Sequence, residues 1–225
     1  MELISKAIRQ APKDLTVTQM CRHLTKAVAR CYVSPMTVLR YGRGQTDYLA
    51  SHPEDRLCAS VVIFSRLRRE IWMIGDCQCL VGGELFENPK PYELPLAELR
   101  AAEAHRLLAS GVTVGQLRAD DAARRTIIPR MIENMKQQNV AYAVVDGFPI
   151  PQSKVRVLAL DFRPWEVVLA SDGYPFLCTT LQESEQKLQC HLHDDPLNIG
   201  DFKATKAFME GNNSFDDRTY LRFKV

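Results

Sequence analysis

Three aspartates lie where predicted strands end or begin. Asp76 follows an apolar run that ends at Gly75. Asp172 follows a second run and precedes Gly173, and Asp217 comes just before the last run of the chain. Because neighbouring strands lie only about 5 Å apart, carboxylates at their ends can converge. Close carboxylates repel each other unless a cation or a proton lies between them, and Mg²⁺ and Mn²⁺ favour oxygen ligands. The pattern is compatible with a divalent-cation site, although each strand–Asp–Gly segment alone is typical of a turn.

Two other segments carry residue types that can bind metals. Asp146-Gly147 also follows an apolar stretch, but a turn into Phe148 is the preferred interpretation because single motif matches often mislead. His191 and His193 have no partners at zinc-type spacing. We interpret them as the C-terminal end of a helix, where the helix dipole favours histidine.

No nucleophile or general base is identified from the sequence. The chain has neither a Gly-x-Ser-x-Gly elbow nor a Walker loop. Ser60 and Ser171 lie in predicted strands and are interpreted as packing residues. Cys77 is interpreted as a buried, inert thiol, because no histidine or lysine lies near it in the sequence.

Apolar runs and amphipathic stretches predict the elements that position these residues. Runs separated by turns predict an antiparallel meander over Cys58–Val81, with strands covered on both faces. Asp120 is a plausible N-cap for a helix that Pro129 should kink or split. Strands and helices that occur in groups favour an α+β fold. We predict helices over Thr16–Cys31, Leu96–Ser110, Asp120–Gln138, Thr180–His191 and Lys203–Met209, further strands over Ala141–Val145, Val155–Leu160, Trp165–Ala170 and Thr219–Val225, and a looser stretch over Arg40–Arg56.

The composition is that of an ordinary folded protein. With 46% hydrophobic and 25% charged residues among 225, the chain can bury a core. We expect a single domain over residues 1–225, with a helical insertion around 94–138. The net charge of +2 is too small to indicate a nucleic-acid or membrane partner. No apolar run is long enough to span a bilayer, and no secretory signal precedes Thr16, so we expect a cytoplasmic protein.

Taken together and in order, the aspartate motifs resemble those of the type 2C, metal-dependent serine/threonine protein phosphatases. The resemblance extends from about Thr16 to the C-terminus. The matching segments are Ala59-Ser60-Val61-Val62-Ile63, Ile74-Gly75-Asp76-Cys77-Gln78, Leu169-Ala170-Ser171-Asp172-Gly173-Tyr174 and Asp216-Asp217-Arg218-Thr219. The resemblance implies a two-layer antiparallel β-sandwich flanked by helices, an α-β-β-α arrangement. It also implies a binuclear Mg²⁺ or Mn²⁺ centre whose bridging water attacks phosphoserine or phosphothreonine.

The resemblance also assigns individual residues. Asp172 and Asp217 match metal ligands, and Asp76 matches a position that supports the centre or holds an additional, weaker metal. Gly75, Gly173 and Asp216 are supporting residues of the same motifs.

The chain departs from the family pattern at its beginning. The family's opening strands carry an arginine that grips phosphate and an Asp-Gly whose carboxylate bridges both metals. No segment before Thr16 matches them, and Asp14 is a poor substitute. Two functions follow as hypotheses: a divergent phosphatase that acts on a phosphoprotein substrate, or a catalytically inactive module of the same fold that binds a protein partner.

Overall fold

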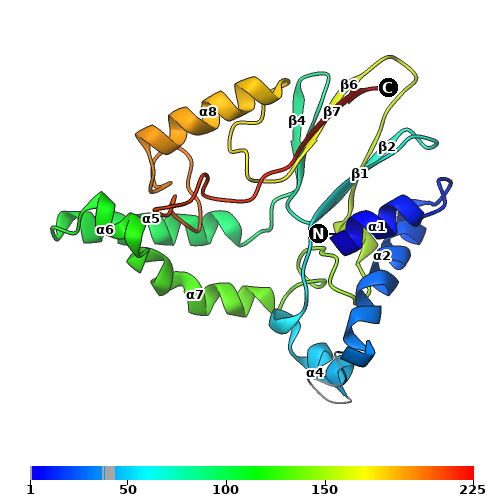
Figure 1. The fold of residues 1–225 in the computed structure, drawn as a ribbon, viewed down its shortest axis with the longest axis horizontal. Helices are drawn as coiled ribbons and strands as arrows, with labels where there is room; N and C mark the ends of the chain where they lie inside the picture. Colours follow the sequence, from blue (N-terminus) through cyan, green and yellow to red (C-terminus); the bar gives the residue numbers. More distant parts are fainter. Residues whose placement is uncertain (1, 37, 39–43) are drawn as a thin grey trace. The chain divides into compact units, whose positions relative to one another are not determined.

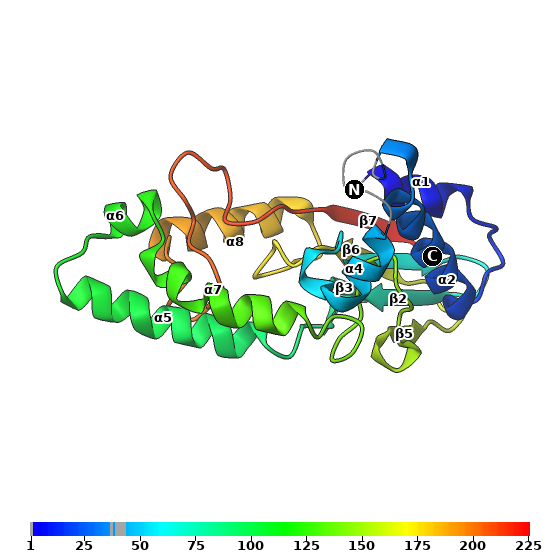
Figure 2. The ribbon, with the colours of Figure 1, turned by 90° about the horizontal axis from the view of Figure 1, so that it is seen from below.

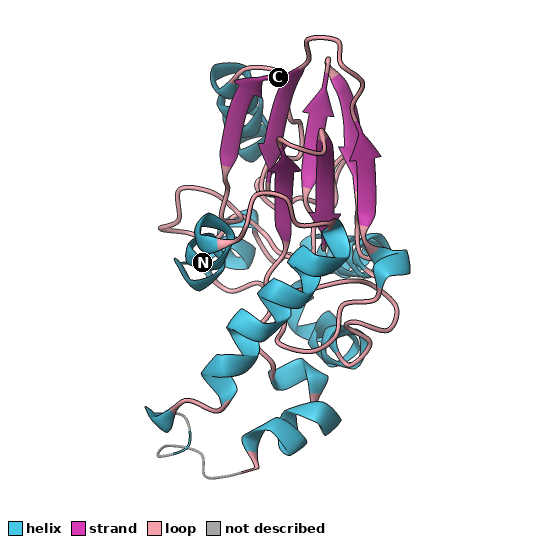
Figure 3. Ribbon diagram, turned by 90° about the vertical axis from the view of Figure 1, so that its right-hand side faces the viewer, coloured by secondary structure: helices cyan, strands magenta, loops and turns pink. Residues whose placement is uncertain are grey.

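The chain forms two compact units in the computed structural model, which describes residues 2–36, 38 and 44–225. The first unit comprises Met1–Cys77 and Met135–Arg163, and the second comprises Gln78–Asn134 and Pro164–Val225. Each unit contains one antiparallel sheet, whose strands are magenta in Figure 3. The predicted α+β class is therefore confirmed. The elements, coloured along the chain in Figure 1, are α1 (Glu2–Gln10), α2 (Val17–Tyr32), α4 (Gln45–Ser51), η1 (Pro53–Asp55), β1 (Val61–Ser65), β2 (Glu70–Ile74), β3 (Gln78–Val81), β4 (Glu84–Glu87), α5 (Glu93–Ala109), α6 (Val114–Ala119), α7 (Ala122–Met135), η2 (Gln152–Lys154), β5 (Arg156–Ala159), β6 (Glu166–Ala170), α8 (Leu181–Asp194) and β7 (Tyr220–Lys224).

Helix α2 supplies much of the core of the first unit. Its start is fixed by a capping box, in which the Thr16 hydroxyl accepts from the backbone N–H of Gln19 and the Gln19 side chain accepts from that of Thr16. Met20, Leu24 and Val28 recur every fourth residue and form one buried stripe. The helix predicted over this segment is confirmed.

The sheet of the first unit has the order β1-β2-β5. β1 and β2 form an antiparallel hairpin in which Ile63 lies opposite Trp72, and β5 pairs with the other edge of β2. As the central strand, β2 is buried from Ile71 to Ile74. Trp72 and Ile74 belong to the same buried cluster as the stripe of α2, so this cluster joins helix and sheet.

The sheet of the second unit has the order β4-β3-β6-β7, with every neighbouring pair antiparallel. Gln78 of β3 lies opposite Ala170 of β6, which in turn lies opposite Tyr220 of β7. The two central strands are almost wholly buried, whereas β4 and β7 at the edges are largely exposed. This burial explains why the central strands read as continuous apolar runs.

Helices α5, α6 and α7 pack around small residues of the second unit (Figure 2). Ala101 and Ala104 of α5 meet Leu117 of α6 and Ala123 of α7 in one buried cluster. Alanine at these positions lets the helix backbones approach closely, which is the reason the middle of the chain is rich in alanine. These helices lie in the region around residues 94–138, where helices were predicted.

A buried ion pair fixes the start of α7. Arg100 of α5 donates to Asp121 through Nε at 2.9 Å and contacts it through Nη2 at 2.8 Å, and both side chains are buried. Asp121 Oδ1 also accepts from the backbone N–H of Arg124 at 3.0 Å, as an N-cap does. Asp120, the predicted N-cap, instead ends α6. Of the two effects expected of Pro129, a kink or a split, the split does not occur, because α7 continues through Pro129.

The predicted meander is wrong at its third strand. β3 pairs with β4 and β6 and belongs to the second sheet, whereas β2 is completed by β5. Gly75, with φ of +86°, lies in the connection between β2 and β3, and a Cβ there would overlap Ser60. Both its dihedral angle and its close contact therefore require glycine. Apolar runs alone do not reveal this change of sheet.

Two other predicted elements do not form. The segment Ala141–Val145, which is buried from Tyr142 on, makes only isolated bridges, one of them between Val145 and Ala59. Lys203–Met209 is irregular, because the carbonyls of this segment accept from side chains elsewhere in the second unit, including those of Arg124 and Asn198. Such side-chain contacts compete with helical hydrogen bonds.

Part of the looser stretch predicted over Arg40–Arg56 forms a helix. Gln45–Ser51 forms α4, which the sequence pattern did not predict, and Gly42 lies outside the described residues.

Within the described part of the chain, no helix combines the length and the apolar character that crossing a membrane requires.

We predict that Arg100→Met destabilises the protein by about 3 kcal/mol, since removing one partner of a buried ion pair leaves the other charge uncompensated. The free energy of unfolding from urea titrations measures this loss. The matched control is Arg106→Met, which breaks an exposed pair with Glu103 on the same helix and should leave the free energy of unfolding nearly unchanged. Equal losses in the two variants would contradict the structural role of Arg100.

Candidate metal centre

Asp172 lies in the loop that follows β6, where it is exposed. Hydrogen bonds from one buried side chain hold this loop on both sides of Asp172. The side-chain amide of Gln78, at the start of β3, donates to the carbonyl of Ser171 at 2.7 Å and to that of Tyr174 at 2.9 Å. Because Gln78 is itself buried in the sheet, the loop is anchored to the rigid part of the unit.

The same loop is joined to the segment that precedes β7. Ser171 Oγ accepts from the backbone N–H of Thr219 at 2.9 Å and donates to the carbonyl of Asp217 at 3.4 Å. A Cβ at Gly173 would overlap that carbonyl, so only glycine permits the close approach. Ser171 therefore ties two of the predicted motifs together, a role that its interpretation as a packing residue missed.

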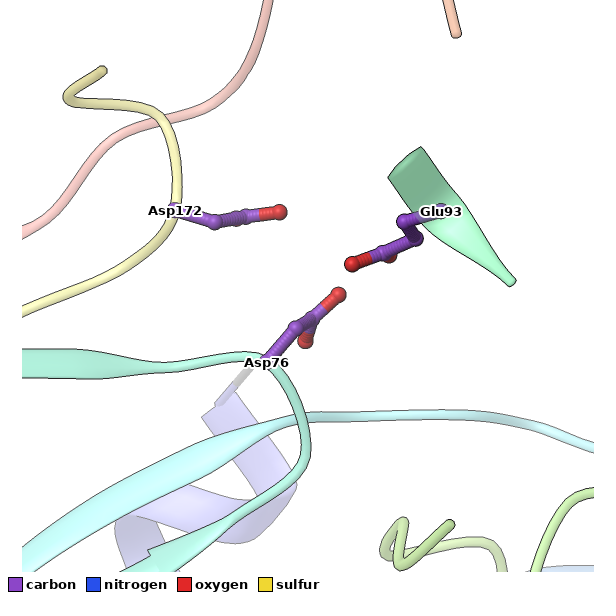
Figure 4. Close-up of side chains that lie close together, drawn as sticks. All are labelled: Asp76, Glu93 and Asp172. Carbon is purple, nitrogen blue, oxygen red and sulfur yellow. The ribbon is translucent and has the colours of Figure 1, made fainter. Parts of the chain in front are cut away.

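Glu93 is an acidic partner of Asp172 that the sequence did not suggest. It lies in the first turn of α5, and one of its carboxylate oxygens comes within 4.8 Å of one of Asp172. Figure 4 shows the two side chains pointing toward each other from α5 and from the loop after β6. Acidic residues are common in the first turn of any helix, so no sequence signal marked this one.

Lys90 lies beside this pair of carboxylates. Its ammonium nitrogen is 3.2 Å from Glu93 Oε1, and its backbone N–H donates to Glu93 Oε2 at 3.3 Å. The Lys90 side chain is largely buried, with 15% of its surface exposed. The charge of the Glu93 carboxylate is therefore already balanced by the Lys90 ammonium group.

Asp76, also labelled in Figure 4, belongs to the first unit, at the residue that follows Gly75. Ser60 Oγ donates a hydrogen bond to Asp76 Oδ1. Ser60 directly precedes β1, so its hydroxyl holds this carboxylate at the end of the β1–β2 hairpin. The interpretation of Ser60 as a packing residue was therefore incomplete.

Asp216 and Asp217 lie just before β7, as the sequence predicted. The surroundings of their carboxylates differ from those of the Asp172 carboxylate. Asp217 is exposed. Asp216 accepts from the backbone N–H of Asp217 at 2.9 Å and forms an ion pair with Lys206 at 2.6 Å. The backbone of Asp217 thus lies beside the Asp172 loop, while its neighbour Asp216 has a structural partner.

Glu185 of α8 connects the residues that follow Asp172 and Asp217. Arg218 donates to both Glu185 oxygens, at 2.8 and 2.9 Å, and the hydroxyl of buried Tyr174 donates at 2.6 Å. The bonds from Arg218 and Tyr174 keep the pKa of Glu185 below its usual value. Burial, together with the bond to Glu185, raises the pKa of Tyr174 to about 12. This network fixes both candidate segments to one helix.

The remaining candidates have structural partners. Asp146 is fully buried and accepts from Arg56 Nη1 at 3.0 Å, from Asn139 Nδ2 at 2.7 Å and from the backbone N–H of Phe148 at 2.9 Å. It is therefore the turn residue that the preferred interpretation described, with Gly147 at φ of +88°. His191 and His193 lie in the last turn of α8, as predicted.

No known protein family, curated protein or solved structure matches this chain.

We predict that Glu185→Gln lowers the free energy of unfolding at neutral pH and that this difference shrinks in acid. A carboxyl whose pKa is depressed in the folded state stabilises the fold above its unfolded pKa, here near 4.5, and loses that contribution as the pH falls through its folded pKa. Urea titrations of wild type and variant between pH 7 and pH 3 measure the difference. Glu98→Gln, at an exposed position of α5, is the control, and a constant difference for Glu185→Gln would contradict the assignment.

Proposed function

We propose that this protein is a divergent relative of the type 2C phosphatases that binds Mg²⁺ or Mn²⁺ and hydrolyses phosphoester groups of phosphoproteins. The observation that carries the proposal is the approach of the Asp172 and Glu93 carboxylates beside a loop anchored by Gln78. Asp76 and Asp217 are the further ligands that the motif resemblance adds. A sandwich of the two antiparallel sheets with helices outside is part of the same proposal.

The donor set fits a hard divalent ion. Mg²⁺ binds oxygen ligands at about 2.1 Å, so two ligand oxygens on opposite sides of one ion are about 4.2 Å apart. The Asp172 and Glu93 oxygens come within 4.8 Å of each other, which a small side-chain rotation would bring into this range. When bound, such an ion would lower the pKa of a coordinated water and neutralise phosphoryl oxygens. The chain's own part is to hold the two carboxylates in place.

A second candidate function is a catalytically inactive module of the same fold that binds a protein partner. The Lys90–Glu93 ion pair favours it, because Lys90 already supplies positive charge where a second metal ion would otherwise be needed. In this case the carboxylates and the lysine stabilise the loop, and at most one ion binds weakly.

The first test is Mn²⁺ titration by calorimetry, with hydrolysis of p-nitrophenyl phosphate and of phosphopeptides followed on the same samples. We expect Asp172→Asn to weaken Mn²⁺ binding by about tenfold or more, since it removes one charged ligand. Asp201→Asn, an exposed position elsewhere in the second unit, is the matched control and should bind as wild type does. Asp76→Asn and Asp217→Asn examine the two further ligands separately.

The outcomes separate the two functions. Binding and turnover that are both lost in Asp172→Asn support the phosphatase. Binding without turnover supports a metal-binding module that is not an enzyme. No binding by the wild type contradicts the metal centre and leaves only the inactive module.

We further predict that Lys90→Met tightens Mn²⁺ binding several-fold, because the variant removes a cation that competes for Glu93. The same titration measures this change. Lys187→Met, on exposed α8, controls for a general loss of positive charge. Weaker binding in Lys90→Met would show that the lysine orients Glu93 and does not compete with the metal ion.

A further inference from the structure

The first unit contains an apolar groove between the segment that follows α1 and the β1–β2 hairpin. Its cavity measures about 600 Å³. Trp72, Met20 and Ile63 are buried side chains that line it, and Leu67 at the tip of the hairpin has 69% of its surface exposed. A groove of this size accommodates one or two bulky side chains of a ligand.

The borders of the groove are positively charged. Residues 8–15 and 63–69 carry one acidic side chain, Asp14, and five basic ones, which are Arg9, Lys13, Arg66, Arg68 and Arg69. Lys13 and Arg66 line the cavity itself, and both are exposed. Within the described part of the chain, Arg66 has no ion-pair partner. The charge of this border is therefore available to a ligand.

The other two arginines of the hairpin, Arg68 and Arg69, make the groove rigid. Both donate to backbone carbonyls, so no carboxylate neutralises their charge in these contacts. Arg68 donates to the carbonyls of Leu15 at 2.8 Å and Asp14 at 2.9 Å, which joins the hairpin tip to the opposite side of the groove. Arg69 donates to the carbonyls of Asp161 and Arg163. A site whose two sides are linked in this way needs little ordering when it binds a ligand.

We propose that this groove binds an acidic peptide segment of a partner protein, which inserts a bulky apolar side chain between Leu67 and Pro12. The positive border selects acidic residues on either side of that anchor and increases the rate of association. The apolar interior supplies the affinity, as buried anchors do at protein interfaces. A peptide fits better than a membrane surface, because the apolar residues line a concave site and do not form an exposed flat face. The proposal does not depend on the metal centre.

The test begins with selection from a random library of displayed 12-residue peptides against the full chain. We expect enrichment of peptides in which a large apolar residue is flanked by Asp or Glu. Fluorescence anisotropy of one labelled, selected peptide then measures affinity for wild type and variants. Lys13→Glu combined with Arg66→Glu should weaken binding by about tenfold or more, with a larger effect at low salt. Leu67→Ser should weaken it without changing the salt dependence.

Arg30→Glu is the matched control, because it reverses an exposed charge on α2 of the same unit and should leave the affinity within about twofold. Circular dichroism confirms that each variant is folded. The proposal is overturned if no peptide is enriched, if the enriched peptides lack acidic residues, or if their binding ignores the groove variants. Binding to phosphatidylserine vesicles that is lost in the double variant, with no peptide enriched, would assign the groove to a lipid surface.

Discussion

A charged side chain can be buried only when an opposite charge and hydrogen-bond partners accompany it, and each unit of this protein is organised around one such pair. In the first unit, Asp146 is fully buried against Arg56, whose guanidinium also lies 3.7 Å from the centre of the Phe148 ring. In the second unit, Arg100 and Asp121 are equally enclosed. Both pairs join segments that are distant in sequence.

The pairs also explain why irregular segments hold their shape. Arg100 donates to the carbonyls of Leu197 and Ala204, and Asp121 accepts from the backbone N–H of Ala207. These contacts satisfy backbone groups in a segment that has no helix or strand of its own, where unpaired buried groups would be costly. The pairs fix loops that hydrophobic packing alone would leave undetermined.

The candidate metal centre follows a similar rule of charge balance. Strand pairing brings the loop after β6 beside the segment before β7, and Gln78, Ser171 and Glu185 then fix the two segments. Glu93 adds a second carboxylate, and Lys90 adds a cation. The lysine therefore balances part of the negative charge that these carboxylates bring together.

Local physical chemistry made several elements predictable. The helices predicted to begin at Thr16 and Thr180 are confirmed, and at each of them the threonine hydroxyl accepts from the backbone N–H three residues further on. The strands β2 and β6 were equally clear, because central strands are apolar on both faces. The pairing of the strands was harder to predict from the sequence. β3 belongs to a different sheet from β2 because it pairs with β6, which lies far away in the chain.

The sequence by itself determined that Asp76, Asp172 and Asp217 lie at strand boundaries, because hydrophobic periodicity and glycine constraints act over a few residues. Only the tertiary structure decided that Glu93, Lys90 and Glu185 accompany the segments of Asp172 and Asp217 within the second unit. Glu93 and Glu185 come from helices and Lys90 comes from the segment before α5, and their local sequence patterns carry no sign of these contacts, which arise only when distant segments pack together. The charged border of the groove has the same origin, because Lys13 and Arg66 come together only when α1, α2 and the hairpin share one core.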